Sequence, residues 1–103
     1  VDEELIPAST SLASCGIAYA LRYIRAAMEG GVELGFRADD AKRIVMQTLR
    51  GAADILEAND SHPEAEIDRV TTPGGLTIKG LNAMEAAGFT PSVIEGLRAS
   101  TKR

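Results

Sequence analysis

Apolar residues recur every three or four positions along most of the chain, which is the period of an amphipathic α-helix. Ala is the strongest helix former, and sixteen of the 103 residues are Ala. The alternating patterns typical of strands are nearly absent, so we expect an all-α domain of about five helices. The first helix should begin at a capping hydroxyl within 9–11 and end at Gly35. Its apolar stripe is Ile17, Leu21, Ile24, Met28 and Val32.

A second face of this helix carries only small residues, namely Gly16, Ala20, Ala27 and Gly31. A glycine inside a helix costs about 1 kcal/mol relative to alanine. This face therefore predicts that another backbone approaches closely; a helix that is merely weak is the alternative.

Four further helices follow from the same periodicity and from capping residues. Pro63 is suited to the first turn of a helix, and Gly88 is suited to end one. Thr90 and Pro91 predict the start of the last helix. The expected helices cover residues 38–58, 63–69, 75–87 and 90–103.

Composition limits the function classes. A chain of 103 residues, 45% hydrophobic and 25% charged, fits one globular domain over 1–103 with a modest core. The net charge of −4 argues against nucleic-acid binding, since the phosphate backbone is itself negative. One cysteine excludes an intrachain disulfide and a cysteine-rich zinc site.

No segment predicts secretion or membrane insertion. The longest run without charges, residues 5–21, contains Pro7 and several hydroxyl residues. Acidic residues precede it, whereas a signal peptide begins with basic ones. We therefore expect a cytoplasmic protein that binds no membrane.

The segment Thr71-Thr72-Pro73-Gly74-Gly75-Leu76-Thr77 carries the most chemical information. It leads into a predicted helix, whose first N–H groups lack partners within the helix and favour an anion. Glycines let a ligand approach the backbone, and the hydroxyls add donors. The segment thus indicates a carboxylate or phosphate site. An ordinary loop, in which Thr72 or Thr77 bonds to the backbone, is the alternative.

Other polar and aromatic residues favour structural roles. Gly74-Gly75 is no dinucleotide fingerprint, which needs three spaced glycines after a strand. No second His or Cys lies at metal-ligand spacing. We expect packing for Cys15, Tyr19 and Tyr23, and solvent exposure for His62 and for the acidic residues Glu64, Glu66 and Asp68.

The segment Thr71 to Ile78 resembles the signature of the pyrroline-5-carboxylate reductases. Gln47-Thr48 followed by Gly51-Ala52-Ala53 is similar to another segment of that family. Ser14 to Tyr19 stands where the family carries Gly-Ser-Gly-Pro-Ala-Tyr. The resemblance extends over residues 9–103.

This resemblance implies the C-terminal helical domain of a reductase, interlocked with a partner subunit in a homodimer or in a larger assembly of such dimers. A separate N-terminal Rossmann domain would bind NADP or NAD. The reaction implied is reduction of 1-pyrroline-5-carboxylate to L-proline, the last step of proline biosynthesis. The chain alone, without that domain, should be inactive.

The resemblance also implies roles for individual residues. The Thr72 hydroxyl, the N–H groups of Gly75 and Leu76, and the Thr77 hydroxyl would hold the substrate carboxylate. Thr77, placed to reach the ring nitrogen, is the residue nearest to the chemistry. Val70 would line the ring pocket, and Asp60 is a weaker candidate.

Some residues depart from the family pattern. Ile17 replaces a proline, Ser14 and Cys15 replace Gly-Ser, and Leu76 replaces a small or hydroxyl residue. Two alternatives therefore stand beside the reductase hypothesis: a related reductase acting on another imino acid, and a non-catalytic helical dimerisation module.

Overall fold

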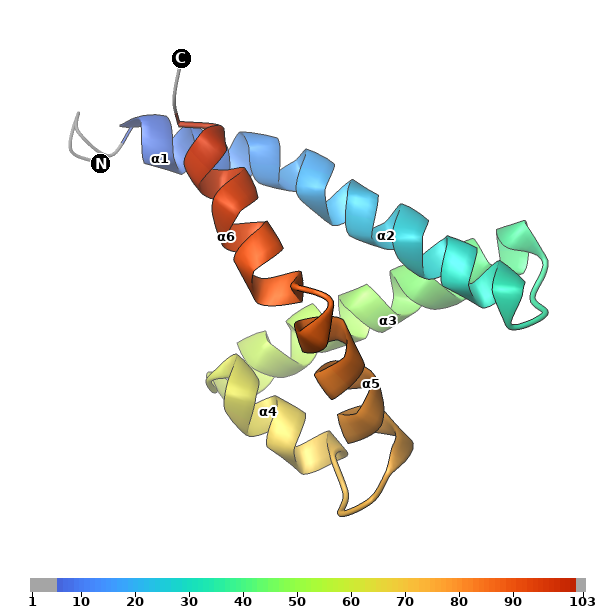
Figure 1. Ribbon diagram of the computed structural model, residues 1–103. Coiled ribbons are helices and arrows are strands. Elements are labelled where there is room, and N and C mark those ends of the chain that lie inside the picture. Colours follow the sequence, from blue (N-terminus) through green and yellow to red (C-terminus); the bar gives the residue numbers. More distant parts are fainter. Residues whose placement is uncertain (1–5, 102–103) are drawn as a thin grey trace.

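The computed structural model describes residues 6–101, and this part of the chain contains helices and no strands (Figure 1). The segments are α1 (Ile6–Thr10), η2 (Ser11–Cys15), α2 (Gly16–Glu33), α3 (Ala38–Asn59), α4 (Pro63–Val70), α5 (Leu76–Ala86) and α6 (Phe89–Ala99). The π-helical turn η2 joins α1 to α2 without a break, so these three segments form one N-terminal rod. When that rod is counted once, the described residues contain five helices, which confirms the predicted all-α class.

Most helix boundaries lie where the capping residues predicted them. Gly35 and Gly88 adopt φ values of 113° and 95°, which a residue with a side chain rarely adopts, and they follow the ends of α2 and α5. Pro63 occupies the first position of α4. These punctuating residues therefore determine where the chain turns.

The predicted starts of the first and last helices are wrong. Ser11 lies inside the N-terminal rod, and its hydroxyl donates to the Leu97 carbonyl of α6 instead of capping a helix. Gly88, not Thr90, is the N-cap of α6. The left-handed Gly88 already redirects the chain, so the helix begins directly after it. The Thr90 hydroxyl donates to the Glu85 carboxylate.

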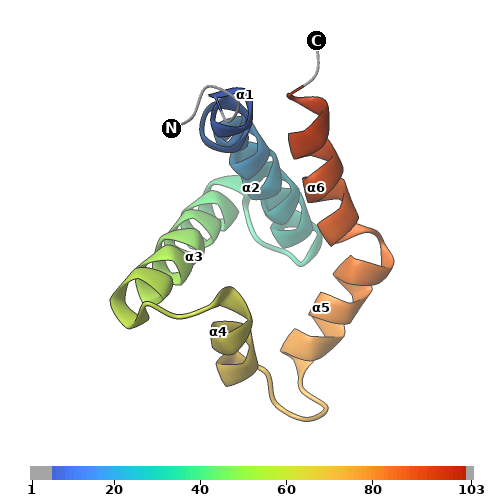
Figure 2. The same cartoon turned by 90° about the vertical axis from the view of Figure 1, so that its left-hand side faces the viewer.

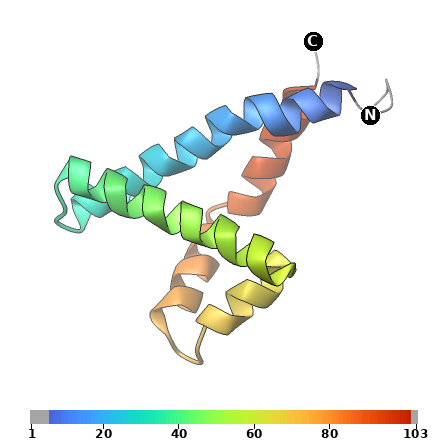
Figure 3. The ribbon, with the colours of Figure 1, turned by 180° about the vertical axis from the view of Figure 1, so that it is seen from behind.

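The helices follow one another around the outline of the molecule instead of enclosing a shared core (Figure 2). α2 and α3 lie close where Leu34–Arg37 connects them and diverge from there (Figure 3). The radius of gyration is 15.7 Å, against about 13 Å for a compact domain of this length. The chain on its own is therefore expanded.

The core expected within one chain is absent. Ala41, 3% exposed, is the one fully buried apolar residue among residues 7–101. Leu21, in the middle of the predicted stripe, is 59% exposed, and Ile17 and Val32 are also exposed. The accessible surface is 8242 Å², whereas a folded monomer of this mass exposes about 5,600 Å². The stripes are correctly identified as apolar, but this single chain does not cover them.

A few close contacts hold the helices in place. A Cβ added to Gly31 would lie 3.0 Å from the Ala41 Cβ, so α2 and α3 approach each other closely there. This confirms the predicted close approach at Gly31. The Tyr19 hydroxyl donates to the Gly96 carbonyl at 3.1 Å, and Tyr23 meets Phe89 edge to face at 6.4 Å between ring centroids. Both tyrosines thus contact α6, as the packing prediction requires, although Tyr19 and Tyr23 remain 37% and 40% exposed.

Across residues 6–101, no helix has both the length and the apolar character that crossing a bilayer requires.

The contact between Gly31 and Ala41 gives a prediction for stability. Gly31→Leu should destabilise the chain by about 1–3 kcal/mol, because the new side chain overfills the closest approach of α2 and α3. The neighbouring Gly30 has nothing within 4 Å of an added Cβ. Gly30→Leu should leave stability unchanged or raise it by up to about 1 kcal/mol. Urea unfolding at one fixed protein concentration measures both; equal losses would contradict this account of the contact.

Candidate functional site

The segment between α4 and α5 is a tight turn followed by the start of a helix. The Gly75 N–H donates to the Thr72 carbonyl at 2.9 Å, which closes a four-residue turn. Pro73 takes the second place, and Gly74, with φ of 71°, takes the third, which is the pattern of a type II turn. This hydrogen bond occupies the Gly75 N–H, which the family resemblance assigned to the substrate carboxylate.

Gly75 brings the backbone close to the Thr72 side chain. A Cβ at Gly75 would clash with the Thr72 hydroxyl oxygen and approach the Thr72 carbonyl to 3.1 Å. Position 75 therefore requires glycine because of space, although its own φ of −74° is ordinary. Two of the predicted site residues are thus brought together at the entrance to α5.

The N-terminus of α5 has N–H groups that no side chain caps, and its first turn holds no acidic residue. Within residues 6–101, neither the Thr72 nor the Thr77 hydroxyl forms a hydrogen bond. Thr71 is the one that bonds to the backbone, through a long contact of 3.3 Å to the Asp68 carbonyl. The structure therefore does not contain the alternative loop, in which the Thr72 or the Thr77 hydroxyl would bond to the backbone. Two hydroxyls and the N–H groups of Leu76 and Thr77 remain for a ligand.

Leu76 is the first residue of α5, and its side chain is 85% exposed. This large apolar side chain belongs to the same residue as one of the proposed N–H donors. Any ligand held there would therefore have an apolar group beside it. The structure places no other side chain over it within the described chain.

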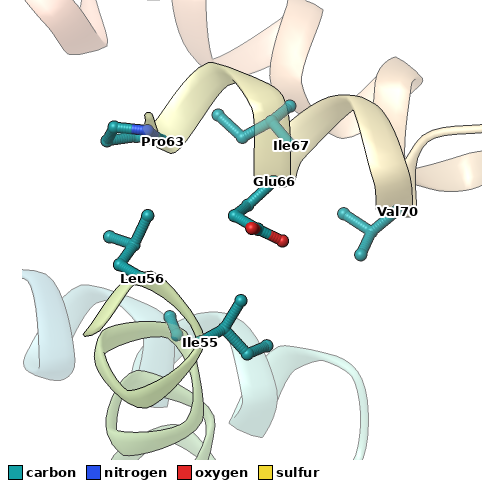
Figure 4. Close-up of a pocket in the computed structure, with 7 residues that line it drawn as sticks. Ile55, Leu56, Pro63, Glu66, Ile67 and Val70 are labelled. Carbon is teal, nitrogen blue, oxygen red and sulfur yellow. The ribbon is translucent and has the colours of Figure 1, made fainter. Parts of the chain in front are cut away.

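Val70 points away from the turn, into a cavity of about 250 Å³ between α3 and α4 (Figure 4). Ile55 and Leu56 from α3 face Ile67 and Val70 from α4 across this space. The Val70 side chain is also 63% exposed to solvent. The cavity is apolar apart from the Glu66 carboxylate, and Val70 links it to the loop that follows.

Glu66 lies between α4 and α3, with its side chain 16% exposed (Figure 4). One of its oxygens, Oε2, accepts three hydrogen bonds: from Asn59 Nδ2 at 3.0 Å, from Ser61 Oγ at 2.5 Å and from Arg69 Nη1 at 2.6 Å. The expectation that Glu66 belongs to a solvated acidic face is therefore wrong. The missed signal was the set of donors on both sides of it in the sequence.

These contacts change the acidity of Glu66. Hydrogen bonds from Ser61 and then Asn59 lower the pKa of its carboxyl below the ordinary value of 4.5, and Arg69 adds to this, although burial opposes it. The carboxylate is therefore ionised at neutral pH, with its charge compensated by neighbouring donors.

His62 and Asp60 have defined places in the turn before α4. The His62 Nδ1 accepts a hydrogen bond from the Glu64 N–H at 3.1 Å and so caps α4. Asp60 adopts the left-handed conformation, with φ of 46°, at the end of α3 and is exposed. His62 thus has a structural role that its position before a proline did not reveal. Among residues 6–101, no hydrogen bond or ion pair joins Asp60 to the Thr72–Gly75 turn.

A larger cavity, about 640 Å³, lies elsewhere, between α2 and the helices α5 and α6. It is lined by apolar and aromatic side chains, including Tyr23, Met84, Phe89 and Val93. None of the predicted ligand-binding residues reaches it.

The described residues do not fit a dinucleotide or a metal ion. No strand lies within residues 6–101, so the strand–turn–helix that receives a pyrophosphate has no counterpart there. In the same part of the chain, no three His, Cys, Asp or Glu residues gather closely enough to hold a metal ion. What this arrangement can do is bind a small anion at α5.

Comparison with known proteins agrees with the resemblance in the sequence. The family model described as pyrroline-5-carboxylate reductase dimerisation matches residues 3–103. Pyrroline-5-carboxylate reductases 1 and 2 of Dictyostelium discoideum are 54% and 50% identical to the chain, over 99% and 100% of its length. The chain spans 18% of the first relative and 34% of the second.

Solved structures show the same arrangement of helices. A pyrroline carboxylate reductase from Plasmodium falciparum, solved with NADP bound, matches 98% of this chain with a TM-score of 0.95 at 27% identity. A 1-pyrroline-5-carboxylate reductase from Streptococcus pyogenes gives the same TM-score at 32% identity. The chain corresponds to 38% and 39% of these structures.

The lowered pKa of Glu66 gives a prediction for the pH dependence of stability. A carboxyl whose pKa is lowered by folding stabilises the native state above its unfolded pKa, and this stabilisation is lost as pH falls through the folded pKa. Glu66→Gln should therefore be less stable than the unsubstituted chain near pH 6, and the difference should shrink between pH 5 and pH 3. Urea unfolding over this range measures it.

Glu64→Gln is the matched control, because the Glu64 carboxylate forms no hydrogen bond or ion pair within residues 6–101. Its stability should differ little from that of the unsubstituted chain at each pH. A Glu66→Gln difference that stays constant from pH 6 to pH 3 would contradict the assigned role of the ionised carboxylate.

Proposed function

The chain belongs to the pyrroline-5-carboxylate reductase dimerisation family, and from this premise we propose that it is the helical domain of an enzyme that reduces 1-pyrroline-5-carboxylate to L-proline. The observation that carries the proposal is the start of α5. There the hydroxyls of Thr72 and Thr77 and the first N–H groups of the helix have no hydrogen-bond partner within residues 6–101. The relatives and the solved structures described above are pyrroline-5-carboxylate reductases, which supports the same activity.

The reaction adds a hydride to the C5=N carbon and a proton to the nitrogen, and NADP or NAD in its reduced form is the hydride source. The described residues do not themselves fit a dinucleotide, so a separate dinucleotide-binding domain is part of this proposal. Chain 1–103 alone should therefore be inactive. A cytoplasmic location stays a prediction from the sequence.

In this proposal the substrate carboxylate lies at the N-terminus of α5. The Thr72 and Thr77 hydroxyls and the N–H groups of Leu76 and Thr77 donate to its oxygens, while Gly75 keeps the backbone accessible. Thr77 also lies closest to the ring nitrogen. These groups bind and orient the substrate and perform no acid–base chemistry, so positioning is the catalysis that they contribute.

We further propose that a second copy of the chain covers the exposed apolar stripes. The accessible surface exceeds the value expected for a folded monomer by about 2,600 Å² per chain. For two chains that is about 5,200 Å², which falls at the upper end of obligate dimer interfaces. Interlocked helices bury this much area more readily than two flat faces do. Larger assemblies of such dimers are compatible with this arrangement.

The two alternatives make different predictions. A related reductase would turn over another imino acid better than pyrroline-5-carboxylate, and the exposed Leu76 is where such a difference would arise. A non-catalytic module would dimerise without turnover of any imino acid.

Replacing Thr77 tests the carboxylate site. In the complete polypeptide that contains this chain, Thr77→Val should lower kcat/KM for pyrroline-5-carboxylate roughly 10- to 100-fold, since a hydrogen bond to a charged group contributes about 1.5–3 kcal/mol. The assay follows the loss of NADPH absorbance, with NADH in parallel.

Thr71→Val is the matched control, because the Thr71 hydroxyl bonds to the Asp68 carbonyl and not to the proposed ligand. It should keep kcat/KM within about twofold. Equal effects of the two substitutions would overturn the site, and an inactive parent protein would overturn the reductase proposal.

A charge placed on the apolar stripe tests the dimer. Leu21→Lys should raise the dissociation constant of the dimer at least tenfold. Leu21 is exposed in the single chain, and dimerisation would bury the new lysine ammonium group without a partner charge. Glu29→Lys, at an exposed charged position on the same helix, is the control and should associate normally. Sedimentation equilibrium gives both constants; a Leu21→Lys protein that associates like the parent would place the interface elsewhere.

A further inference from the structure

Helix α4 is only eight residues long, and it leads directly into the proposed binding turn. Isolated helices of this length are marginal in water, so contacts with the rest of the chain must fix its position. One residue, Thr71, separates Val70, the last residue of α4, from Thr72. Any shift of α4 therefore carries over to the turn.

The hydrogen bonds of Glu66 connect α4 to the chain on either side of it. Asn59 is the last residue of α3, and Ser61 lies in the turn that follows. Arg69 lies one turn further along α4 and is 59% exposed, while the Glu66 side chain is 16% exposed. A single carboxylate oxygen thus joins the end of α3, the connecting turn and the C-terminal half of α4.

This connection restrains both the axial position and the rotation of α4. Glu66 and Val70 are four residues apart, so they share a face of the helix, and both line the cavity against α3 (Figure 4). Beyond Val70, the Thr71 N–H donates to the Asp68 carbonyl at 3.4 Å. The restraint therefore continues to the first residue before the turn.

We propose that Glu66 is a positioning residue for substrate binding: by accepting hydrogen bonds from Asn59, Ser61 and Arg69, it fixes α4 so that the Thr72–Gly75 turn and the start of α5 present their donors in register. This inference rests on the proposed reductase function. Glu66 does not touch the substrate and acts through α4. Displacements of about 1 Å in a binding site are enough to change its kinetics measurably.

The test compares kinetics in the complete polypeptide that contains this chain. Glu66→Gln should raise KM for pyrroline-5-carboxylate roughly three- to tenfold, the range expected for the loss of one hydrogen bond. KM for NADPH should stay unchanged and kcat should stay within about twofold. A general loss of folded protein would instead lower the apparent kcat and leave both KM values unchanged, so the pattern separates positioning from destabilisation.

Three further variants complete the design. Glu64→Gln makes the same chemical change two residues earlier in the same helix, and its KM values should equal those of the parent. Glu66→Gln combined with Arg69→Gln restores the net charge and should still show the raised KM, which excludes an effect of the freed arginine. Ser61→Ala should raise KM, and adding it to Glu66→Gln should raise KM by less than the product of the two separate effects, because Glu66→Gln weakens the hydrogen bond that Ser61→Ala removes.

An unchanged KM for pyrroline-5-carboxylate in folded Glu66→Gln would overturn the inference. Should that variant lose its helical circular dichroism signal, the milder Ser61→Ala decides by the same comparison of KM values. If the parent protein turns over pyrroline-5-carboxylate and the Glu66→Gln variant has the same KM, the positioning role is rejected and the proposed function stands. A parent without turnover of pyrroline-5-carboxylate would reject the proposed function and this inference together.

Discussion

The burial of apolar helix faces governs this molecule, and one chain cannot accomplish it. The helices run around the outline of the fold, and Ala41 is the one fully buried apolar residue among residues 7–101. Hydrophobic burial is the main favourable contribution to folding, so an expanded chain with exposed stripes needs a partner surface. The membership in a dimerisation family agrees with this physical requirement. The close approach of Gly31 to Ala41 and the tyrosine contacts of α2 shape the frame onto which that surface must fit.

Without a core inside the chain, short-range polar interactions determine the geometry of the candidate site. His62 caps α4, Glu66 ties α4 to the end of α3, and the hydrogen bond from Gly75 to Thr72 closes the turn that starts α5. Each of these contacts joins residues within a short stretch of sequence. The geometry of the proposed anion site can therefore form locally, while the proposed dimer would supply the burial that stabilises the whole.

The sequence predicted those features that depend on local chemistry. Pro63, Gly35 and Gly88 mark helix ends because each restricts or frees the backbone at its own position. The Thr72–Gly75 segment was identified for the same reason. The role of Glu66 was missed, because its donors come from a turn whose position the sequence does not reveal. The single-chain core was wrongly expected, because periodicity shows which face is apolar and not which chain covers it.

The most direct test of this account is a dilution series of the 103-residue chain, followed at each concentration by sedimentation velocity and by far-ultraviolet circular dichroism. The account predicts that helical signal and dimer mass fall together, since the apolar faces of a lone chain stay exposed to water. A monomer that keeps its full helical signal and unfolds cooperatively, at concentrations where no dimer remains, would contradict it.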